Sequence, residues 1–306
     1  MRISSIDIGT NTVLLLIAEV NNYNLKVLRE EFRIPRIGKD ISLLKQINID
    51  SIEKLKLIIK EYDSICKEYK VDKIFCVGTA PFRQAMNSLE VIHEIYESTG
   101  IKIKVLSADE EAQLTFIGGI SSFHRVLNSE YFMVIDVGGG STELILGTSN
   151  NILIKKSYPI GAVILRDKFF YSFPYTFSLQ KIIDFLTEVF LDIHEFEKQN
   201  AIGIAVAGTP TTLASIKLGL TRFNESLVDK LPLEIEFLKE FIQISYNISP
   251  LEVLKQYPSV VPGREDVILP GAIILYFLMN KLNLPKIFTS TRGVRYGVIF
   301  KELNLF

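Results

Sequence analysis

The sequence predicts an α/β protein made of two related halves. Apolar strand-like runs alternate with amphipathic helical stretches along the whole chain, which is typical of this class. An aspartate followed by glycine and small polar residues occurs twice, in "IDIGTNT" and in "IDVGGGSTEL". Gly78 follows Asp7 by 71 residues and Gly208 follows Asp136 by 72 residues, and each of these glycines precedes a threonine. Two copies of one order at one spacing indicate a duplicated domain.

The first half is predicted to begin with a strand hairpin and to end with a helix. Residues 48–69 place apolar side chains at helical spacing, which predicts a helix. A further helix is expected around His93, a strand over 101–107 and a helix over "ADEEAQLTFIGG". The expected strands before them are "ISSIDIG", "TVLLLIAEV", a run within "VLREEFRIPRIG", and "KIFCVG", which leads through a Gly-Thr turn into a helix start.

The second half repeats this order. "YFMVIDVGGGSTELILG" is expected to form a hairpin, "LQKIIDFLTEVFLDIHEF" a helix, and "AIGIAVAGTPTTLASI" a strand, a turn and a helix. In the last of these, Thr209 is the expected N-cap and Pro210 the expected first helical residue. Residues 267–282 predict a buried core helix, because their charge-free run is shorter than the ~18 residues that a membrane span needs.

The composition predicts a globular protein of the cytoplasm. Of the 306 residues 48% are hydrophobic, and the formal net charge of −1 gives no general attraction to nucleic acid. Cys66 and Cys76 lack a metal-binding spacing and are expected as buried free thiols in a reducing compartment. The segment "MRISSIDIG" predicts no export signal. We expect one domain over residues 1–127, with about 290–306 as a candidate completion, and a second over 128–290.

The glycine-rich turns and the Gly-Thr junctions are candidate phosphate sites. Glycines let backbone N–H groups approach an anion without hindrance from a Cβ atom. A helix N-terminus attracts anions through its free N–H groups and its dipole. Ordinary hairpin turns are the alternative. The candidate residues are Asp7, Gly9, Thr10, Asn11, Thr12, Gly138, Gly139, Gly140, Ser141, Gly208 and Thr209.

Asp136 and Glu143 flank the second glycine-rich turn, so a hairpin would bring them to facing strand ends. Mg²⁺ takes one or two carboxylates and completes its coordination with waters and phosphate oxygens. The pair is therefore a candidate magnesium site. The first half has Leu14 where the second has Glu143, which would place the metal on one side only. The alternative is a turn-capping aspartate and an exposed glutamate.

Two neighbouring glutamates open the helix in "LSADEEAQL". Ser107 and Glu110 have the spacing of a capping box, which accounts for Glu110. Glu111 is not explained by that motif. Beside a phosphate site it could act as a general base on water. A solvated glutamate favoured by the helix dipole is the alternative.

Basic side chains supply further candidates. Arg83 lies just inside the helix after the first Gly-Thr turn, where its guanidinium could hold two phosphate oxygens. Residues 255–301 carry a basic excess, which indicates either a groove for a polyanion or a scattered solvated surface. Its members are Lys255, Arg264, Lys281, Lys286, Arg292, Arg295 and Lys301. The histidines, His93, His124 and His194, have neither metal nor triad spacing.

Together these motifs closely resemble the exopolyphosphatase/guanosine pentaphosphate phosphohydrolase (Ppx/GppA) family in its short two-domain form. The resemblance runs through nearly the whole chain, in the family's order. It rests on "IDIGTNT", "VGTAPFRQAMN", "LSADEEAQLTFIGG", "IDVGGGSTEL", "SYPIGAVILRDKF", "AGTPTTLAS", "GREDVILPGA" and "TSTRGVRYG". It implies two duplicated ribonuclease-H-like domains with an interdomain cleft, as in the actin, sugar-kinase and heat-shock-ATPase superfamily.

The same resemblance implies roles for the candidate residues. Glu111 would be the general base, and Asp136 and Glu143 the carboxylates on the magnesium side. Asn11, Arg83, Gly138, Gly139, Ser141, Gly208 and Thr209 would line the phosphate path. Members of the family break phosphoanhydride bonds by direct attack of water on a terminal phosphoryl group.

The expected substrate is inorganic polyphosphate. Hydrolysis of guanosine pentaphosphate is the first alternative, since it also presents a terminal phosphoanhydride. A regulator that binds guanosine penta- or tetraphosphate, or another nucleotide, without turnover is the second. A phosphotransferase that uses ADP as acceptor is a smaller possibility. Neither a nucleic-acid polymer nor a membrane is expected as a partner, and a homodimer is a candidate assembly.

Overall fold

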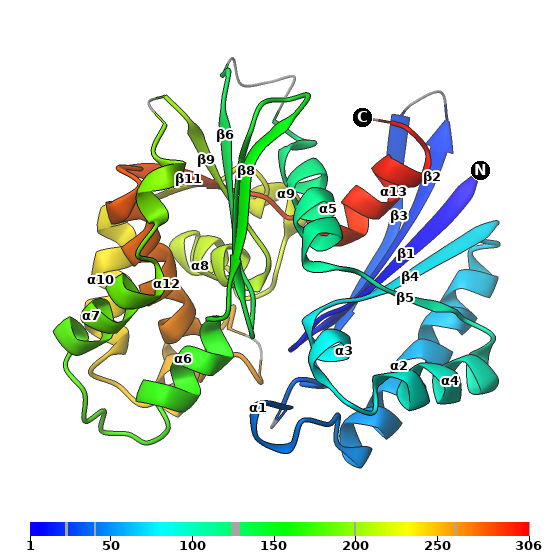
Figure 1. The fold of residues 1–306 in the computed structure, drawn as a ribbon, viewed down its shortest axis with the longest axis horizontal. Coiled ribbons are helices and arrows are strands. Elements are labelled where there is room, and N and C mark those ends of the chain that lie inside the picture. The colour runs from blue at the N-terminus through cyan, green and yellow to red at the C-terminus, as the bar shows by residue number, and fades with distance from the viewer. Residues whose placement is uncertain (22–23, 40, 124–128, 199, 261, 306) are drawn as a thin grey trace. The chain divides into compact units, whose positions relative to one another are not determined.

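The computed structural model describes the whole chain except residues 22–23, 40, 124–128, 199, 261 and 306. The chain divides into two compact units, which we call unit 1 (residues 1–118 with 294–306) and unit 2 (residues 119–293). Each unit contains one mixed sheet with helices packed against it (Figure 1). The fold is therefore α/β, as the sequence predicts.

Unit 1 is built on a five-stranded sheet with the order β3-β2-β1-β4-β5. Its strands are β1 (Arg2–Ile8), β2 (Val13–Asn21), β3 (Asn24–Arg33), β4 (Lys73–Gly78) and β5 (Ile103–Val105). The first three form an antiparallel meander, and the last two add to β1 in parallel. Its helices are α1 (Ile41–Leu44), α2 (Ile49–Glu68), α3 (Ala80–Gln84), α4 (Ser88–Thr99), α5 (Ala108–Ile120) and α13 (Val294–Glu302).

The longest helix of unit 1 shows how local sequence forms these elements. The Asn48 side chain accepts a hydrogen bond from the Ser51 N–H at 2.8 Å, which caps α2 at its N-terminus. Leu55 and Ile59 are fully buried in the core of unit 1. Tyr62 is also fully buried, and its hydroxyl donates to the Val13 carbonyl at 3.0 Å. The predicted helix is confirmed.

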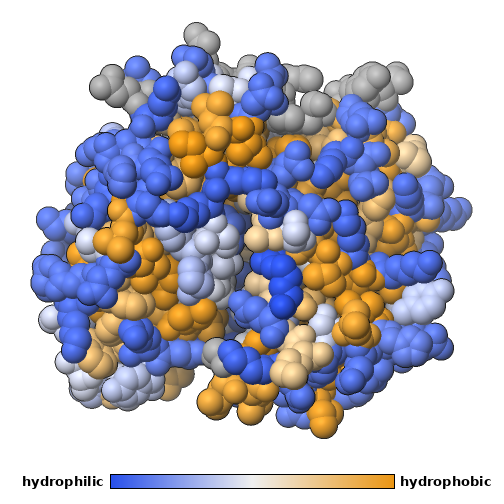
Figure 2. All heavy atoms as spheres, viewed as in Figure 1, coloured by the Kyte–Doolittle hydropathy of each residue, from blue (hydrophilic) through white to orange (hydrophobic). Residues whose placement is uncertain are grey.

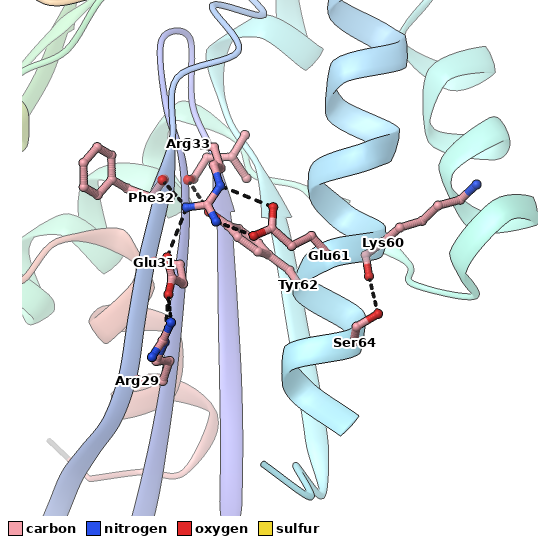
Figure 3. Close-up of polar contacts among 9 residues, drawn as sticks. Arg29, Glu31, Phe32, Arg33, Lys60, Glu61, Tyr62 and Ser64 are labelled. Atoms are coloured by element: carbon pink, nitrogen blue, oxygen red, sulfur yellow. Dashed lines mark hydrogen bonds and ion pairs between the residues drawn. The ribbon is translucent and has the colours of Figure 1, made fainter. Parts of the chain in front are cut away.

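Strand β3 lies at the edge of the sheet and is attached to α2 by charged side chains (Figure 3). Arg33, the last residue of β3, donates through Nε to Oε2 of Glu61 at 3.3 Å and through Nη1 to Oε2 of Glu31 at 3.1 Å. The Arg29 Nε donates to the other oxygen of Glu31 at 2.7 Å. This network anchors the C-terminal end of β3 to α2, and charged side chains protect an edge strand from pairing with another chain.

Unit 2 contains a six-stranded sheet with the order β10-β11-β9-β6-β7-β8. Its strands are β6 (Phe132–Val137), β7 (Thr142–Gly147), β8 (Ile152–Tyr158), β9 (Ile202–Val206), β10 (Pro232–Glu234) and β11 (Lys286–Thr289). The run β8-β7-β6-β9-β11 repeats the order and the strand directions of β3-β2-β1-β4-β5. The predicted duplication is therefore confirmed at the level of strand order.

Helices of unit 2 pack around one large core. They are α6 (Ala162–Phe169), α7 (Leu179–Val189), a 3₁₀ turn η1 (Ile193–Phe196), α8 (Gly208–Lys217), α9 (Glu225–Val228), α10 (Ile235–Ser245), α11 (Pro250–Gln256) and α12 (Ile268–Lys281). α12 is the most apolar of them and is buried along nearly its whole length, as predicted.

Two predicted helix boundaries in unit 2 are wrong. The helix expected over 179–196 ends at Val189, because Phe190 leaves the helical conformation and a separate 3₁₀ turn follows. Helix α8 begins at Gly208, so Thr209 and Pro210 lie inside its first turn rather than at its start. The cause is Ala207, which takes a φ of 72° and turns the chain sharply after β9.

No described helix is both long enough and apolar enough to cross a membrane. On the face drawn in Figure 2, hydrophilic and hydrophobic residues are interspersed.

Candidate functional site

The first glycine-rich turn lies at the C-terminal end of β1. Asp7 pairs with Leu14 across the hairpin, and the Gly9 N–H donates to the Thr12 carbonyl at 2.9 Å, which closes the turn. The Asp7 atom Oδ1 is buried and bonds to no described group. Burial, and then the nearby Glu111 carboxylate, raise the pKa of Asp7 to about 7.

Glu111 lies in the first turn of α5, and the predicted capping box fixes that turn. The Ser107 N–H donates to Glu110 at 3.0 Å, and the Glu110 N–H donates to the Ser107 hydroxyl at 3.1 Å. Glu110 is also paired with Lys104 at 2.8 Å. These contacts occupy Glu110 as predicted and orient the next residue inward, since the Glu111 side chain is only 13% exposed.

Arg83 holds the Glu111 carboxylate. Its Nη1 lies 2.5 Å from Oε2 of Glu111 and 3.0 Å from the Leu106 carbonyl. Burial raises the pKa of Glu111, and the Arg83 guanidinium opposes this rise. The alternative of a solvated first-turn glutamate does not fit this side chain, which is mostly buried and paired.

A second arginine, Arg295 of α13, forms an ion pair with Glu30 and also acts electrostatically on Asp7. Arg295 Nη2 lies 2.8 Å from Oε1 of Glu30, which also accepts from the Tyr296 hydroxyl at 3.1 Å. The Arg295 charge lowers the pKa of Asp7 and partly offsets the effect of burial. Unit 1 thus gathers two carboxylates, Asp7 and Glu111, with two guanidinium groups.

The second glycine-rich turn lies at the C-terminal end of β6. The Gly138 N–H donates to the Ser141 carbonyl at 3.0 Å, the same bond that Gly9 makes to Thr12. Asp136 pairs directly with Glu143 across the hairpin, which brings the two carboxylates to one face of the sheet. Glu143 is only 3% exposed and accepts a hydrogen bond from the Ser157 hydroxyl at 2.7 Å. The alternative of an exposed strand glutamate is therefore wrong.

The Asp136–Glu143 pair fits a magnesium ion in its donor chemistry. Two carboxylates on directly opposed strand positions repel each other unless a cation or proton compensates them. Mg²⁺ needs only one or two protein carboxylates, since water and phosphate oxygens complete its octahedron. Among the described residues no three His, Cys, Asp or Glu side chains cluster as a metal cage, so a magnesium ion here would rely on those other ligands.

The second Gly-Thr junction carries an arginine that the sequence indicates only as part of the basic excess. A Cβ atom at Gly208 would lie 1.7 Å from Nη1 of Arg264, so the guanidinium rests on the first residue of α8. Among the described residues it forms no ion pair or side-chain hydrogen bond, and burial lowers its pKa to about 10. Arg264 lies four residues before α12, and its charged neighbours Glu265 and Asp266 mean that no local pattern in the sequence singles it out.

Thr209, the next residue of this junction, packs against α12. A Cβ atom at Gly271 would lie 2.5 Å from its Oγ1.

The first Gly-Thr junction differs from the second. Helix α3 has five residues, and the Thr79 hydroxyl donates to the Ile8 carbonyl at 3.2 Å rather than capping the helix. What this junction contributes is Arg83, in the last turn of α3.

The remaining candidates are dispersed. Of the basic excess, Arg295 and Lys301 belong to unit 1 and the other five residues to unit 2. Lys281 and Lys286 lie over aromatic rings, which favours a scattered surface. Cys66 and Cys76 are buried free thiols, as predicted. His124 lies outside the described residues.

Comparisons with known proteins agree with these motifs. The sequence profile of the Ppx/GppA phosphatase family matches residues 16–306. The chain is 32% identical to a bifunctional 3-dehydroquinate synthase/phosphatase of Fusobacterium nucleatum over 98% of its own length and 46% of that protein, so it spans about half of that relative. It is 26% identical to exopolyphosphatase 2 of Mycobacterium tuberculosis, over 92% of this chain and 91% of that one.

Solved structures show the same fold. A Ppx/GppA family member from Aquifex aeolicus superposes with a TM-score of 0.84 at 27% identity, over 99% of this chain and 98% of that one. An exopolyphosphatase from Cytophaga hutchinsonii superposes with a TM-score of 0.90 at 24% identity, over 99% and 98% of the two chains. The family profile matches nearly all of the sequence, and a solved member of the family has the same fold. The chain therefore belongs to the Ppx/GppA phosphatase family.

Proposed function

We propose that this protein hydrolyses the terminal phosphoanhydride bond of inorganic polyphosphate and releases phosphate. The observation that carries the proposal is the Glu111 carboxylate, which is mostly buried and held by Arg83 in the first turn of α5. Membership of a phosphatase family supports hydrolysis. The name of the Mycobacterium tuberculosis relative supports polyphosphate as the substrate.

Glu111 acts in this proposal as the general base. Its Oε2 is bonded to Arg83, and its Oε1 bonds to no described residue, which leaves Oε1 to accept a proton from water. A carboxylate whose pKa is raised toward neutrality is a stronger base than an exposed one. The oxygen of that water forms a bond to the terminal phosphorus, and the bond from phosphorus to the bridging oxygen breaks.

The two glycine-rich turns and Arg264 bind phosphate oxygens in this proposal. Free backbone N–H groups and an uncompensated guanidinium both favour an anion. Asp136 and Glu143 would hold Mg²⁺, which supplies positive charge to the phosphate oxygens when bound. Arg83 favours the ionised form of Glu111, and Arg295 partly offsets the rise that burial causes in the pKa of Asp7. Binding, orientation and electrostatics account for the reaction without a covalent intermediate.

Guanosine pentaphosphate is the second candidate substrate, because the Ppx/GppA family groups guanosine pentaphosphate phosphohydrolases with exopolyphosphatases. The same residues would act on its terminal phosphoanhydride. A cytoplasmic location is supported by the two free cysteines, which fit a reducing compartment. A homodimer stays a prediction.

The proposal is tested by measuring phosphate release from tripolyphosphate, long-chain polyphosphate and guanosine pentaphosphate, each with magnesium and with EDTA. Magnesium-dependent release from the polyphosphates at a higher kcat/KM than from guanosine pentaphosphate supports it. The reverse order would make guanosine pentaphosphate the substrate. Tight binding of any of the three without release would indicate a regulator instead of an enzyme.

A further inference from the structure

The second glycine-rich turn is held from behind by helix α6. The N–H groups of Ala162 and Val163 donate to the carbonyls of Gly138 and Gly139, each at 2.9 Å. The Ile164 N–H also reaches the Gly139 carbonyl, at 3.4 Å. The first N–H groups of a helix have no partner inside the helix. In α6 these groups donate hydrogen bonds to the carbonyls of the turn instead.

The first glycine-rich turn is held in the same way by a loop. The Gly38 N–H donates to the Thr10 carbonyl at 2.8 Å, and the Arg36 N–H donates to the Asn11 carbonyl at 3.2 Å. Thr10 and Gly139 occupy the same position in the two turns, three residues after Asp7 and Asp136. Both holding segments follow the third strand of the meander, β3 in unit 1 and β8 in unit 2.

These bonds determine where the turns direct their N–H groups. In a planar trans peptide the C=O of one residue and the N–H of the next point in opposite directions. The turn carbonyls point toward the segment that donates to them, which is residues 36–38 in unit 1 and the start of α6 in unit 2. The N–H group that follows each of these carbonyls therefore points away from that segment. The four N–H groups are those of Asn11, Thr12, Gly139 and Gly140. Within the part of the chain that the structure describes, none of the four donates a backbone or side-chain hydrogen bond.

We propose that residues 36–38 and the N-terminus of α6 are positioning elements, each of which pre-orients the N–H groups of its own turn toward phosphate oxygens. The proposal rests on the proposed function, because it assigns an anion to those N–H groups. Preorganised donors lose little free energy to reorganisation when charge arrives. Both holding segments would therefore act on substrate binding through the turns, without touching the substrate themselves.

Glycine at positions 38 and 161 permits this contact. A Cβ atom at Gly161 would lie 2.5 Å from both the carbonyl carbon and the oxygen of Gly139, which are backbone atoms with no room to move. A Cβ atom at Gly38 would lie 2.2 Å from Cγ2 of Thr10, a side-chain methyl. Gly161 has an extended backbone, with φ −138°, so an alanine there meets only a steric obstacle.

The loop of unit 1 is anchored on its N-terminal side. Arg33, whose network is drawn in Figure 3, anchors the end of β3 three residues before Arg36. Arg36 has a φ of 54°, a left-handed conformation that persists in a residue with a side chain only when its surroundings impose it.

The test uses alanine substitutions and measures the Kd for tripolyphosphate by calorimetry, in the Glu111→Ala background so that the ligand is not consumed. Gly161→Ala should weaken binding by about tenfold or more, since at least one charge-assisted hydrogen bond is misdirected. Gly38→Ala should weaken binding less, and adding Thr10→Ser should restore it by removing the clashing methyl. No such rescue exists for Gly161→Ala, because the obstacle is backbone.

Two controls separate positioning from loss of stability. Gly203→Ala places a Cβ atom 2.7 Å from Cγ2 of Ile287 in the core of unit 2, away from the turn, and Gly293→Ala meets nothing within 4 Å. Both should bind tripolyphosphate within about twofold of the Glu111→Ala parent. A matching loss in Gly203→Ala would show that Gly161→Ala acts through stability, and would overturn the proposal.

The two proposals fail in different ways. If Gly161→Ala binds as tightly as its parent while the wild-type protein hydrolyses polyphosphate, the positioning role is wrong and the enzymatic proposal stands. If the wild-type protein releases no phosphate but Gly161→Ala still weakens tripolyphosphate binding, the enzymatic proposal is wrong and the positioning role stands. If the wild-type protein releases no phosphate and neither it nor the Glu111→Ala parent binds tripolyphosphate, both are wrong.

Discussion

At the scale of single residues, the polar cluster of unit 1 contains two carboxyl groups in different environments. Glu111 has a guanidinium at 2.5 Å, whereas Asp7 has a buried oxygen without a partner. The pKa is raised for both groups, by burial in each case. Environment therefore separates a paired carboxylate suited to proton transfer from a carboxyl group that can hold its proton near neutral pH.

Arg83→Ala should move the acidic limb of the pH–rate profile to higher pH. Glu111 must be ionised to act as the proposed base, and removal of the guanidinium leaves burial unopposed, so the pKa of Glu111 rises. Arg83→Lys, which keeps a cation, should shift the limb less. The measurement is kcat/KM against pH from about 4 to 9 with tripolyphosphate. An unchanged acidic limb in Arg83→Ala would show that another group limits activity at low pH.

Asp7→Asn should change how stability depends on pH. The folded protein keeps a proton on Asp7 up to about pH 7, whereas the unfolded chain loses it near pH 4. The contribution of this group is thus fully present below about pH 4 and is lost as pH rises through 7. Urea unfolding should show the wild type losing on the order of 4 kcal/mol relative to Asp7→Asn over that range. Parallel stability curves would mean that Asp7 titrates at its ordinary pKa.

At the scale of elements, helix α5 depends on a close approach to α13. A Cβ atom at Gly297 would lie 1.9 Å from the Leu114 carbonyl oxygen, so the two helices meet at that glycine. Because Glu111 lies one turn before Leu114 on α5, we expect this contact to fix the position of the proposed base. Close packing of backbone against backbone leaves no side chain that could adjust.

Gly297→Ala should therefore lower both stability and kcat. We expect a loss of about 1–3 kcal/mol in the free energy of unfolding from overpacking. The fall in kcat should exceed the fall in folded fraction, since α5 is displaced in the molecules that remain folded. Gly293→Ala, which has open space, is the matched control. Thermal unfolding and single-turnover rates measure the two effects, and a wild-type kcat in the folded fraction would refute the link.

Elements that local sequence determines were predictable, and those that depend on distant contacts were not. Helix α2 follows from the Asn48 cap and its apolar spacing, and the capping box before α5 follows from Ser107 and Glu110. The start of α8 does not, because it depends on the positive φ of Ala207. The contact of Gly38 with Thr10 joins residues 28 positions apart through a loop, and no local pattern records such a contact.

At the scale of the whole molecule, two units with one strand order differ in their chemistry. Unit 1 pairs Asp7 with Leu14, whereas unit 2 pairs Asp136 with Glu143. The spacing of the motifs predicts the duplication, and the register confirms which positions correspond. The sequence also indicates the asymmetry of the carboxylates. It does not indicate that Arg264 lies on Gly208, since those residues meet only through the fold of unit 2.

Glu143→Gln should raise the magnesium concentration needed for half-maximal activity by about tenfold or more. The amide keeps the shape and the acceptor oxygen for the Ser157 hydroxyl but removes the charge that would attract the ion. Titration of activity with magnesium at saturating tripolyphosphate measures the shift. Leu14→Gln changes the corresponding position of unit 1, and it should leave the magnesium requirement unchanged. Equal magnesium curves for Glu143→Gln and wild type would remove Glu143 from the metal site.

The most direct test of the central claim is phosphate release from tripolyphosphate by Glu111→Gln and Glu110→Gln, measured beside the wild type. The neighbouring glutamates lie on one helix turn, and only Glu111 is proposed as the base. Glu111→Gln should lower kcat by about 10²-fold or more while tripolyphosphate still binds. Glu110→Gln should keep activity and lose at most about 1 kcal/mol of stability at the capping box. A fall of less than tenfold in Glu111→Gln, or the larger fall in Glu110→Gln, would contradict the account.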